Sequence, residues 1–231
     1  MGTLTGQSIA DASWATLGDS VGVDGVRWPE AEVLRYINDG QRETVLNLPS
    51  SFVKTAIVST VSGTRQTLVG SSIVDGIQLI KMTRNFGSAG TVPGRAVTPR
   101  PVSWLDNERP DWHSDASGDA AHYFFDPADP KAWYVWPPSS GSIKAEIVYS
   151  ATPPDLASLA SVISIDDIYS NALQYFVLFR AMTKQANYTK NPMATMFYQL
   201  FLQSLGVKDA RVKALDANQY MAADVPQGAT K

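Results

Sequence analysis

The stretch WPEAEVLRYINDGQRETV, residues 28–45, combines a helical pattern with the turn signal Asn-Asp-Gly at 38–40. Side chains that recur at three- and four-residue steps share one helix face: Val33, Leu34, Ile37, Gln41, Thr44, Val45 and Leu48. A glycine inside a helix costs only about 1 kcal/mol relative to alanine, so the periodicity outweighs the turn signal. We predict one helix over 29–47, with Pro29 in its first turn and with Gly40 where another backbone comes close.

Around this helix, the predicted order of elements is helix, strands, helix. A first helix is expected over 6–17, followed by a glycine-rich loop before residue 28. From residue 52 the apolar pattern changes to a period of two with many β-branched residues, which predicts a hairpin over 53–69. Further strands are expected in GIQLIKMTRNFG (76–87), AHYFFD (121–126), AWYVWP (132–137) and SIKAEIVYS (142–150), and a short helical turn is expected in PVSWLDNERP (101–110).

Two apolar helices are predicted after residue 154. The first is expected to open at Ser164, with Asp166 and Asp167 in its first turn. Pro192 starts the second, which extends to about residue 205. Both helices are apolar around much of their circumference, since four residues fall outside the main stripes: Leu173, Val177, Leu178 and Leu202. In a chain this short, we expect another copy of the protein to cover these four side chains.

The sequence therefore predicts an α+β fold. A helical bundle is built from the N- and C-terminal helices, and an antiparallel β subdomain is inserted between them. The expected boundaries are 1–50 and 151–216 for the helical core, 51–150 for the β-rich subdomain and 217–231 for a flexible C-terminal tail. The tail has no apolar period, so we expect it to be disordered when the protein is alone in solution.

Composition narrows the possible functions. The 231 residues are 44% hydrophobic and 18% charged, with a formal net charge of −3. A sizeable core can form, but no global basic field is available to hold nucleic acid. The absence of cysteine excludes disulfides, thiolate nucleophiles and cysteine zinc sites. The longest apolar runs are too short for a membrane span, and the N-terminal sequence lacks the features of a signal peptide.

No residue cluster predicts catalysis, cofactor binding or metal binding. The sequence has neither a glycine-rich phosphate loop nor a G-x-S-x-G elbow. Asp111, His113 and Asp115 alternate in DWHSD and could form a small metal or acid–base cluster, but a solvated loop is the favoured interpretation. Other carboxylates occur on nearby loops, where aspartate usually stabilises turns: Asp106, Glu108, Asp126 and Asp129.

The aromatic strand KAWYVWPP, residues 131–138, could form a stacking platform for bases or sugars. At strand spacing, Trp133 faces one side of the sheet, while Tyr134 and Trp136 face the other. Both faces therefore carry large rings, as in a sheet that is covered on each side. Packing within the core or between subunits is the favoured interpretation.

The order of several segments resembles the head-to-tail adaptor proteins of tailed bacteriophages, which are also called connector, tail tubular or neck proteins. The segments span most of the chain: RWPEAEVLRYINDGQRETVLNLP (27–49), GTRQTLV (63–69), RNFG (84–87), LDNERPDWHS (105–114), YFFDPADPKAWYVWPP (123–138) and DDIYSNALQYFVLFRAMTKQANYTKNP (166–192). The resemblance is carried by the ordered set rather than by any one segment.

This resemblance implies a structural virion protein with no enzymatic activity. Members of the family assemble, usually as twelve copies, beneath the portal, where the ring extends the DNA channel and presents a docking surface to tail or nozzle proteins. The implied location is the head–tail junction of the virion, after synthesis in the host bacterial cytoplasm. Genomic DNA passes through such a channel without specific binding, and no membrane is involved. A terminal segment commonly reaches toward the portal; here the tail after Ala217, with Tyr220 and Met221, is the candidate.

Two alternatives stay open from the sequence. A related virion part, such as a tail-completion or tube-terminator protein, differs from an adaptor only in its neighbours. A hydrolase or carbohydrate-binding domain would use the Asp- and Trp-rich region 104–136, and an enzyme of this size would often be a monomer or dimer in solution.

Overall fold

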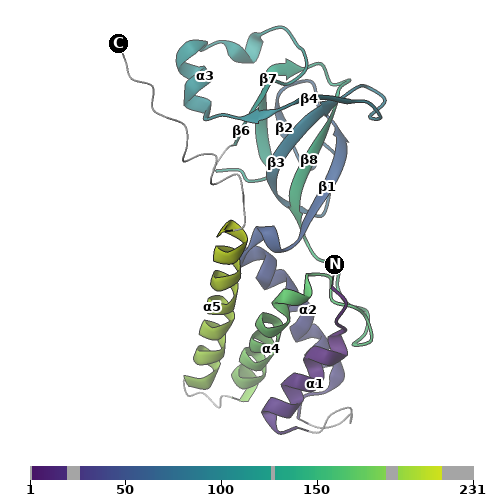
Figure 1. Cartoon of the computed structure of the whole chain (residues 1–231), viewed down its shortest axis with the longest axis vertical. Helices are drawn as coiled ribbons and strands as arrows, with labels where there is room; N and C mark the ends of the chain where they lie inside the picture. Colours follow the sequence, from purple (N-terminus) through teal and green to yellow (C-terminus); the bar gives the residue numbers. More distant parts are fainter. Residues whose placement is uncertain (1, 20–26, 126–127, 186–191, 215–231) are drawn as a thin grey trace. The chain divides into compact units, whose positions relative to one another are not determined.

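The computed structural model describes residues 2–19, 27–125, 128–185 and 192–214, without the side chains of residues 185 and 207–214. The fold is α+β and divides into two compact units (Figure 1). The helical unit comprises Met1–Leu48 with Pro154–Lys231, and the β unit comprises Pro49–Pro153. The predicted tail, 217–231, lies outside the described residues.

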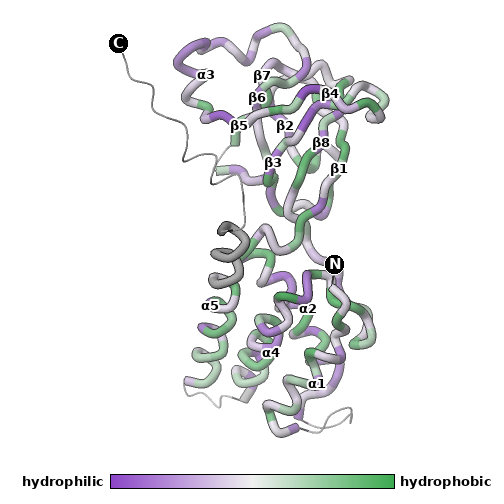
Figure 2. The backbone as a smooth tube through the Cα atoms, viewed as in Figure 1, coloured by the Kyte–Doolittle hydropathy of each residue, from purple (hydrophilic) through white to green (hydrophobic). Residues whose placement is uncertain are grey.

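The helical unit contains four longer helices and one short 3-10 turn in its described residues. They are α1 (Gly6–Leu17), α2 (Glu30–Asn47), the 3-10 turn η3 (Asp167–Tyr169), α4 (Ser170–Gln185) and α5 (Pro192–Ala214). Helix α4 packs against α1, α2 and α5, and α1 also packs against α2. Hydrophobic residues recur along the described part of α5 (Figure 2). Helix α4 is therefore the centre of the unit.

The turn signal in α2 does not interrupt the helix, which is continuous from Glu30 to Asn47 with Pro29 at its N-cap. Asn38 instead binds the segment that returns the chain from the β unit, which we call the connecting segment (residues 154–166). Its Nδ2 donates to the carbonyl of Leu156 (3.2 Å), and the N–H of Leu156 donates to its Oδ1 (2.8 Å). The side-chain amide of Asn38 thus gives the backbone of Leu156 the hydrogen-bond donor and acceptor that a neighbouring strand would otherwise provide.

A second amide of α2 extends this pairing. The backbone N–H of Ser164 donates to Gln41 Oε1 (2.7 Å), and Gln41 is almost completely buried. The connecting segment in turn binds the N-terminal strand-like residues, since the N–H of Ile163 donates to the carbonyl of Leu4 (2.9 Å). Its apolar side chains, Leu156, Leu159, Ile163 and Ile165, are buried.

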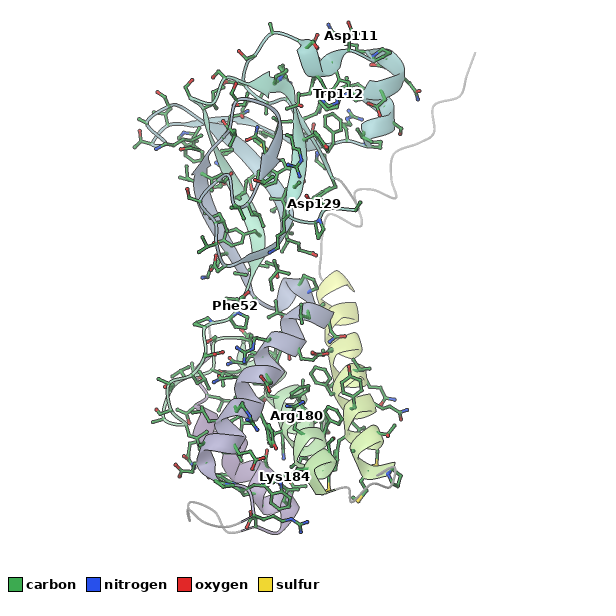
Figure 3. The ribbon with its side chains drawn as sticks, turned by 180° about the vertical axis from the view of Figure 1, so that it is seen from behind. Phe52, Asp111, Trp112, Asp129, Arg180 and Lys184 are labelled. Carbon is green, nitrogen blue, oxygen red and sulfur yellow. The ribbon has the colours of Figure 1, made fainter. Side chains whose placement is uncertain are left out.

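Gly40 lies where α4 approaches α2. A Cβ atom at this position would be 3.1 Å from Phe176 Cδ1 and 3.2 Å from Leu173 Cδ2. The close approach that we predicted is therefore present, but side chains rather than backbone of α4 make it. The same two helices are joined by ion pairs from Arg180 to Asp39 (3.5 Å) and from Lys184 to Glu32 (Figure 3).

The predicted start of the helix after residue 164 is wrong. Helix α4 begins at Ser170, after η3. Asp166 caps η3 by accepting from the N–H of Ile168 (3.0 Å). Asp167 accepts from the backbone N–H groups of Thr3 (2.7 Å) and Leu4 (3.0 Å). The two acidic residues thus cap a short turn and tether the N-terminal segment.

The β unit contains two four-stranded sheets, ordered β1-β8-β3-β4 and β2-β7-β6-β5. The elements are the 3-10 turn η1 (Pro49–Ser51), β1 (Val53–Ser59), β2 (Gly63–Thr67), β3 (Gly76–Phe86), β4 (Pro93–Ala96), β5 (Thr98–Pro99), α3 (Val102–Glu108), the 3-10 turn η2 (Trp112–Ser114), β6 (His122–Phe125), β7 (Ala132–Ser139) and β8 (Lys144–Ala151). The expectation of a purely antiparallel subdomain needs correction, because β5 and β6 pair in parallel.

The predicted hairpin over 53–69 is also wrong. Strand β1 pairs with β8, while β2 pairs with β7 in the other sheet. The chain changes sheets between β1 and β2, where the Thr60 hydroxyl bonds to the Ser139 hydroxyl and to the Ile143 carbonyl (both 2.6 Å). The chain also crosses from one sheet to the other between β7 and β8, at the same corner of the β unit. Each sheet is therefore assembled from segments far apart in sequence.

Side chains of both sheets form one core, which includes Trp133 and Val135. Tyr134 and Trp136 point to the other face of β7 and pack against a smaller cluster of Leu105, Trp112 and Phe124. The interpretation of the aromatic strand as a sheet covered on both faces is confirmed by this burial.

Replacing Asn38 with alanine should lower the free energy of unfolding of the helical unit by about 2–3 kcal/mol, because the buried N–H and C=O of Leu156 lose their partners. Asn47→Ala is the matched control: among the described residues its side chain bonds only to Glu43, at the exposed end of α2, so a change within about 0.5 kcal/mol is expected. Urea denaturation followed by far-UV circular dichroism measures both; equal midpoints for the two variants would contradict the assignment.

Candidate functional site

The acidic and histidine side chains of the segment DWHSD are not grouped as a metal site requires. Among the described residues, no group of three or more acidic or histidine side chains is placed to hold a metal ion. His113 Nδ1 bonds to Thr64 Oγ1 (2.8 Å), and its ring stacks on Trp112 with centroids 3.7 Å apart. Asp111 is exposed and lies well away from Asp129 in Figure 3.

One carboxylate of this segment, Asp115, and one shortly before it, Asp106, accept hydrogen bonds from indole rings. Trp136 Nε1 donates to Asp115 (2.8 Å), and Arg109 also binds Asp115 (3.0 Å). Trp112 Nε1 donates to Asp106 (2.9 Å). The expectation of a solvated loop agrees with the exposure of Asp111 and His113, whereas Asp115 is half-buried. His113 and Asp115 nevertheless bond to Thr64 and Trp136 of the sheet.

The other expected carboxylates do not converge on a site. Asp129 pairs with Arg65 (3.0 Å) and accepts from the N–H of Lys131 (3.1 Å). Glu108 is exposed. Asp126 lies outside the described residues.

Half-buried aromatic rings on the outer side of β6 and β7 pack on one another. His122 lies parallel to Trp136 (interplanar angle 4°, centroids 6.1 Å apart) and edge-on to Trp104 (5.3 Å). Arg100 lies over Trp104 (5.4 Å) and Arg109 over Trp136 (5.8 Å). The rings that could have formed a stacking platform are thus engaged within the β unit.

Burial lowers the pKa of His122 below its ordinary value of 6.5, and the positive charges of Arg100 and Arg95 lower it further. The hydrogen bond with Thr98 acts in the opposite direction. The neutral imidazole is therefore the form that the folded β unit favours.

The structure corrects the reasoning behind three expected interface residues. Leu173, Val177 and Leu178 are 0%, 0% and 2% exposed within the chain itself, because α4 is surrounded by α1, α2 and α5. They are not available to a neighbouring copy. Leu202 is 38% exposed. Tyr220 and Met221 lie outside the described residues.

Helix α5 presents an exposed surface, of which the sequence analysis identified Leu202 alone. From Pro192 to Gly206 the helix contains no charged residue, although one side of it is exposed. Met193 (48%), Met196 (44%) and Leu202 (38%) are the exposed apolar side chains. We define the α5 face by its exposed residues: Pro192, Met193, Thr195, Met196, Gln199, Leu202, Gln203 and Gly206. The signal in the sequence was the lack of charge over 192–206.

A shallow groove of about 190 Å³ borders the α5 face. It is lined by Asn47, Leu48, Leu202, Leu205 and Gly206. The groove is mostly apolar and lies between α5 and the end of α2. Leu202 and Gly206 belong both to the groove and to the α5 face.

A family model described as SU10 adaptor protein matches residues 4–226, which is nearly the whole chain. The chain belongs to the SU10 adaptor protein family. The resemblance to bacteriophage head-to-tail adaptors is thereby confirmed. No curated protein matches the chain.

Membership of this family makes the chain a structural component of a bacteriophage virion that interacts with other head and tail proteins. The family implies a structural rather than an enzymatic role. None of the described helices combines the length and the hydropathy that crossing a bilayer requires.

Replacing Asp115 with alanine should lower the stability of the β unit of the adaptor by about 1–2 kcal/mol, because Trp136 Nε1 and Arg109 both lose a charged acceptor. Asp111→Ala, on the same segment, is the matched control and should change stability by less than about 0.5 kcal/mol. Urea denaturation followed by tryptophan fluorescence compares them. Equal stability of the two variants would show that the segment is held by other contacts.

The lowered pKa of His122 predicts a pH dependence. Since the folded state binds this proton less readily than the unfolded chain, the contribution to stability is full above about pH 6.5 and is lost as the pH falls toward the folded-state pKa. Wild type should therefore lose more stability between about pH 7 and pH 5 than His122→Gln does. An NMR titration with a midpoint for His122 at or above its ordinary pKa would contradict this.

Proposed function

We propose that this adaptor assembles into a ring of twelve copies, the number usual in the resembling family, between the portal and the tail. The ring joins head to tail and extends the DNA channel. Membership of the SU10 adaptor protein family supports the adaptor role, and the α5 face supports self-assembly.

The single observation that carries the proposal is the uncharged, exposed surface of α5. A helix side that remains in water usually carries charged residues, whereas the centres of protein interfaces are depleted in charge and enriched in methionine. Met193, Met196 and Leu202 are each exposed by 38–48%, so covering them gains roughly 1 kcal/mol per residue. Gln199 and Gln203 can bond across an interface without the desolvation cost of a charge.

The position of α5 in the helical unit favours a ring over a closed pair. Helices α5 and α1 lie on opposite sides of α4 in the helical unit (Figure 1). If a neighbouring copy covers the α5 face with the side of its helical unit that lies opposite its own α5, its own α5 face stays free for the next copy. Repetition of such a heterologous contact generates a ring when the rotation closes.

The charge of the chain is compatible with a DNA channel. A net charge of −3 gives no dense array of lysine and arginine that would hold phosphates and release counterions. DNA can therefore slide through the ring without specific binding. The proposed partners are the portal on one side and tail or nozzle proteins on the other, with the C-terminal tail, including Tyr220 and Met221, as the proposed portal contact.

Replacing Met196 and Leu202 together with aspartate should prevent ring formation and leave the subunit folded, because each copy then buries two unpaired carboxylates at its contact. Leu178 is unsuitable for this test, since it is buried in the subunit. Leu46→Asp is the control: Leu46 is 62% exposed on α2, and Arg35, three helical turns earlier on the same side of α2, is exposed as well.

Electron microscopy of the adaptor mixed with its portal measures ring formation, and circular dichroism confirms that each variant is folded. The proposal expects rings with wild type and Leu46→Asp and none with the double variant. Rings of normal appearance with the double variant would remove the α5 face from the interface.

A further inference from the structure

In the described part of the chain, the two sheets of the β unit end in four edge strands, and three of them carry devices that prevent pairing with another strand. Strand β4 has four residues, starts at Pro93 and pairs with a register shift. Strand β5 has two residues, of which one is Pro99. Strand β2 pairs with a register shift after Gly63. Prolines, bulges and short length are the usual means of protecting a sheet edge.

Strand β1, the fourth edge, has none of these devices. Its seven residues pair with β8 in one unbroken register, from Val53 with Ser150 to Ser59 with Lys144. It contains no proline, and its single charged residue, Lys54, is paired with Asp75 (2.6 Å). A long, regular, weakly charged edge is a template for another strand.

The direction of the free backbone groups follows from the hydrogen bonds at the two ends of β1. The N–H of Ala151 donates to the carbonyl of Phe52 (3.1 Å), and the N–H of Thr60 donates to the carbonyl of Ile143 (3.0 Å). Both bonds fit the register of the strand pair. In an antiparallel pair, bonded and non-bonded positions alternate, so the even-numbered residues bond to β8. The odd-numbered residues direct their N–H and C=O groups away from it: Val53, Thr55, Ile57 and Ser59.

The side chains at these odd positions are also exposed. Val53 and Ile57 are each 47% exposed, and Thr55 lies between them. On the opposite face of the strand, Val58 is buried in the core of the β unit and Ala56 packs against that core. A strand added beside β1 would therefore find apolar neighbours on both faces, and β-branched cross-strand pairs stabilise such an arrangement.

We infer that β1 is the docking site for an extended segment of a second virion protein, which adds to the sheet as a fifth strand. The segment has about five to seven residues, lacks proline and is rich in apolar or β-branched side chains, since main-chain bonds supply affinity and alternate side chains supply specificity in this mode of recognition. Its backbone supplies the donors and acceptors that the outward groups of β1 lack.

A second copy of this chain is a poorer occupant than a different protein. The other three edges of the described sheets are protected, and antiparallel pairing of β1 with β1 of another copy is a two-fold contact. Copies that share one orientation in a ring cannot repeat a two-fold contact. The choice of a different protein over a second copy rests on the proposed ring, whereas the availability of the β1 edge for strand pairing does not.

Hydrogen exchange tests the site directly, with residue-resolved mass spectrometry on the isolated adaptor, on its ring with the portal and on intact phage particles. In the isolated adaptor, the amides of Thr55 and Ile57 should exchange quickly and those of Ala56 and Val58 slowly. In the particle, Thr55 and Ile57 should slow at least tenfold. Unchanged fast exchange in the particle would overturn the inference, and slowing already in the ring with the portal would overturn the choice of occupant.

Thr55→Pro provides a matched genetic test. Proline removes the outward N–H at this position and leaves the bonds between β1 and β8 intact, since proline is tolerated at the free side of an edge strand. Thr55→Val keeps the N–H and is the control. We expect Thr55→Pro to fold and to form the ring with the portal, but to reduce the yield of infectious particles at least tenfold relative to Thr55→Val.

Equal yields from the two variants would overturn the inference and leave the proposed ring untouched. Loss of the ring itself in Thr55→Pro, with the subunit folded by circular dichroism, would also overturn it, because β1 would then belong to the contact between copies.

Discussion

The hydrogen bonds between α2 and the connecting segment are the constraint on which the helical unit depends. Asn38 binds both backbone groups of Leu156, and Gln41 accepts from the N–H of Ser164. These bonds join two parts of the chain that the whole β unit separates in sequence. Once the connecting segment is fixed to α2, its continuation holds the N-terminal residues and leads into α4. Each buried amide is worth more here than on the surface, because its loss leaves backbone groups without water or a partner.

Much of the fold follows from the local sequence pattern, and the predictions that were wrong have a common cause. The three- and four-residue steps over 28–48 identify α2, and the period of two identifies β3 and the strands from β6 to β8. The hairpin over 53–69 was wrong because strand partners are chosen over long range: Val53 pairs with Ser150. Asn38 looked like a turn signal for the same reason. Its partner, Leu156, lies 118 positions away in the sequence, and a pattern among neighbouring residues cannot reveal a contact with so distant a residue.

Prediction of the candidate interface from the sequence has a comparable limit. Apolar residues around the circumference of a helix indicate burial on several sides, but they do not indicate which molecule supplies each side. For Leu173 and Val177 the chain supplies all of them, because α4 has three helical neighbours. The exposed residues of the proposed interface carry a different signal, namely the absence of charge from Pro192 to Gly206. That signal is present in the sequence, but it consists of missing charged residues rather than of apolar residues that recur at a fixed spacing.

The β unit is one uninterrupted stretch of chain, Pro49–Pro153, set between two segments that complete the helical unit without it. In genetic terms, it is a cassette. Two crossovers, one at each boundary codon, would exchange the β unit between related phage genomes as a whole, and no buried amide pair of the helical unit would be divided. The surfaces of one unit can therefore diversify by recombination while those of the other drift by point mutation.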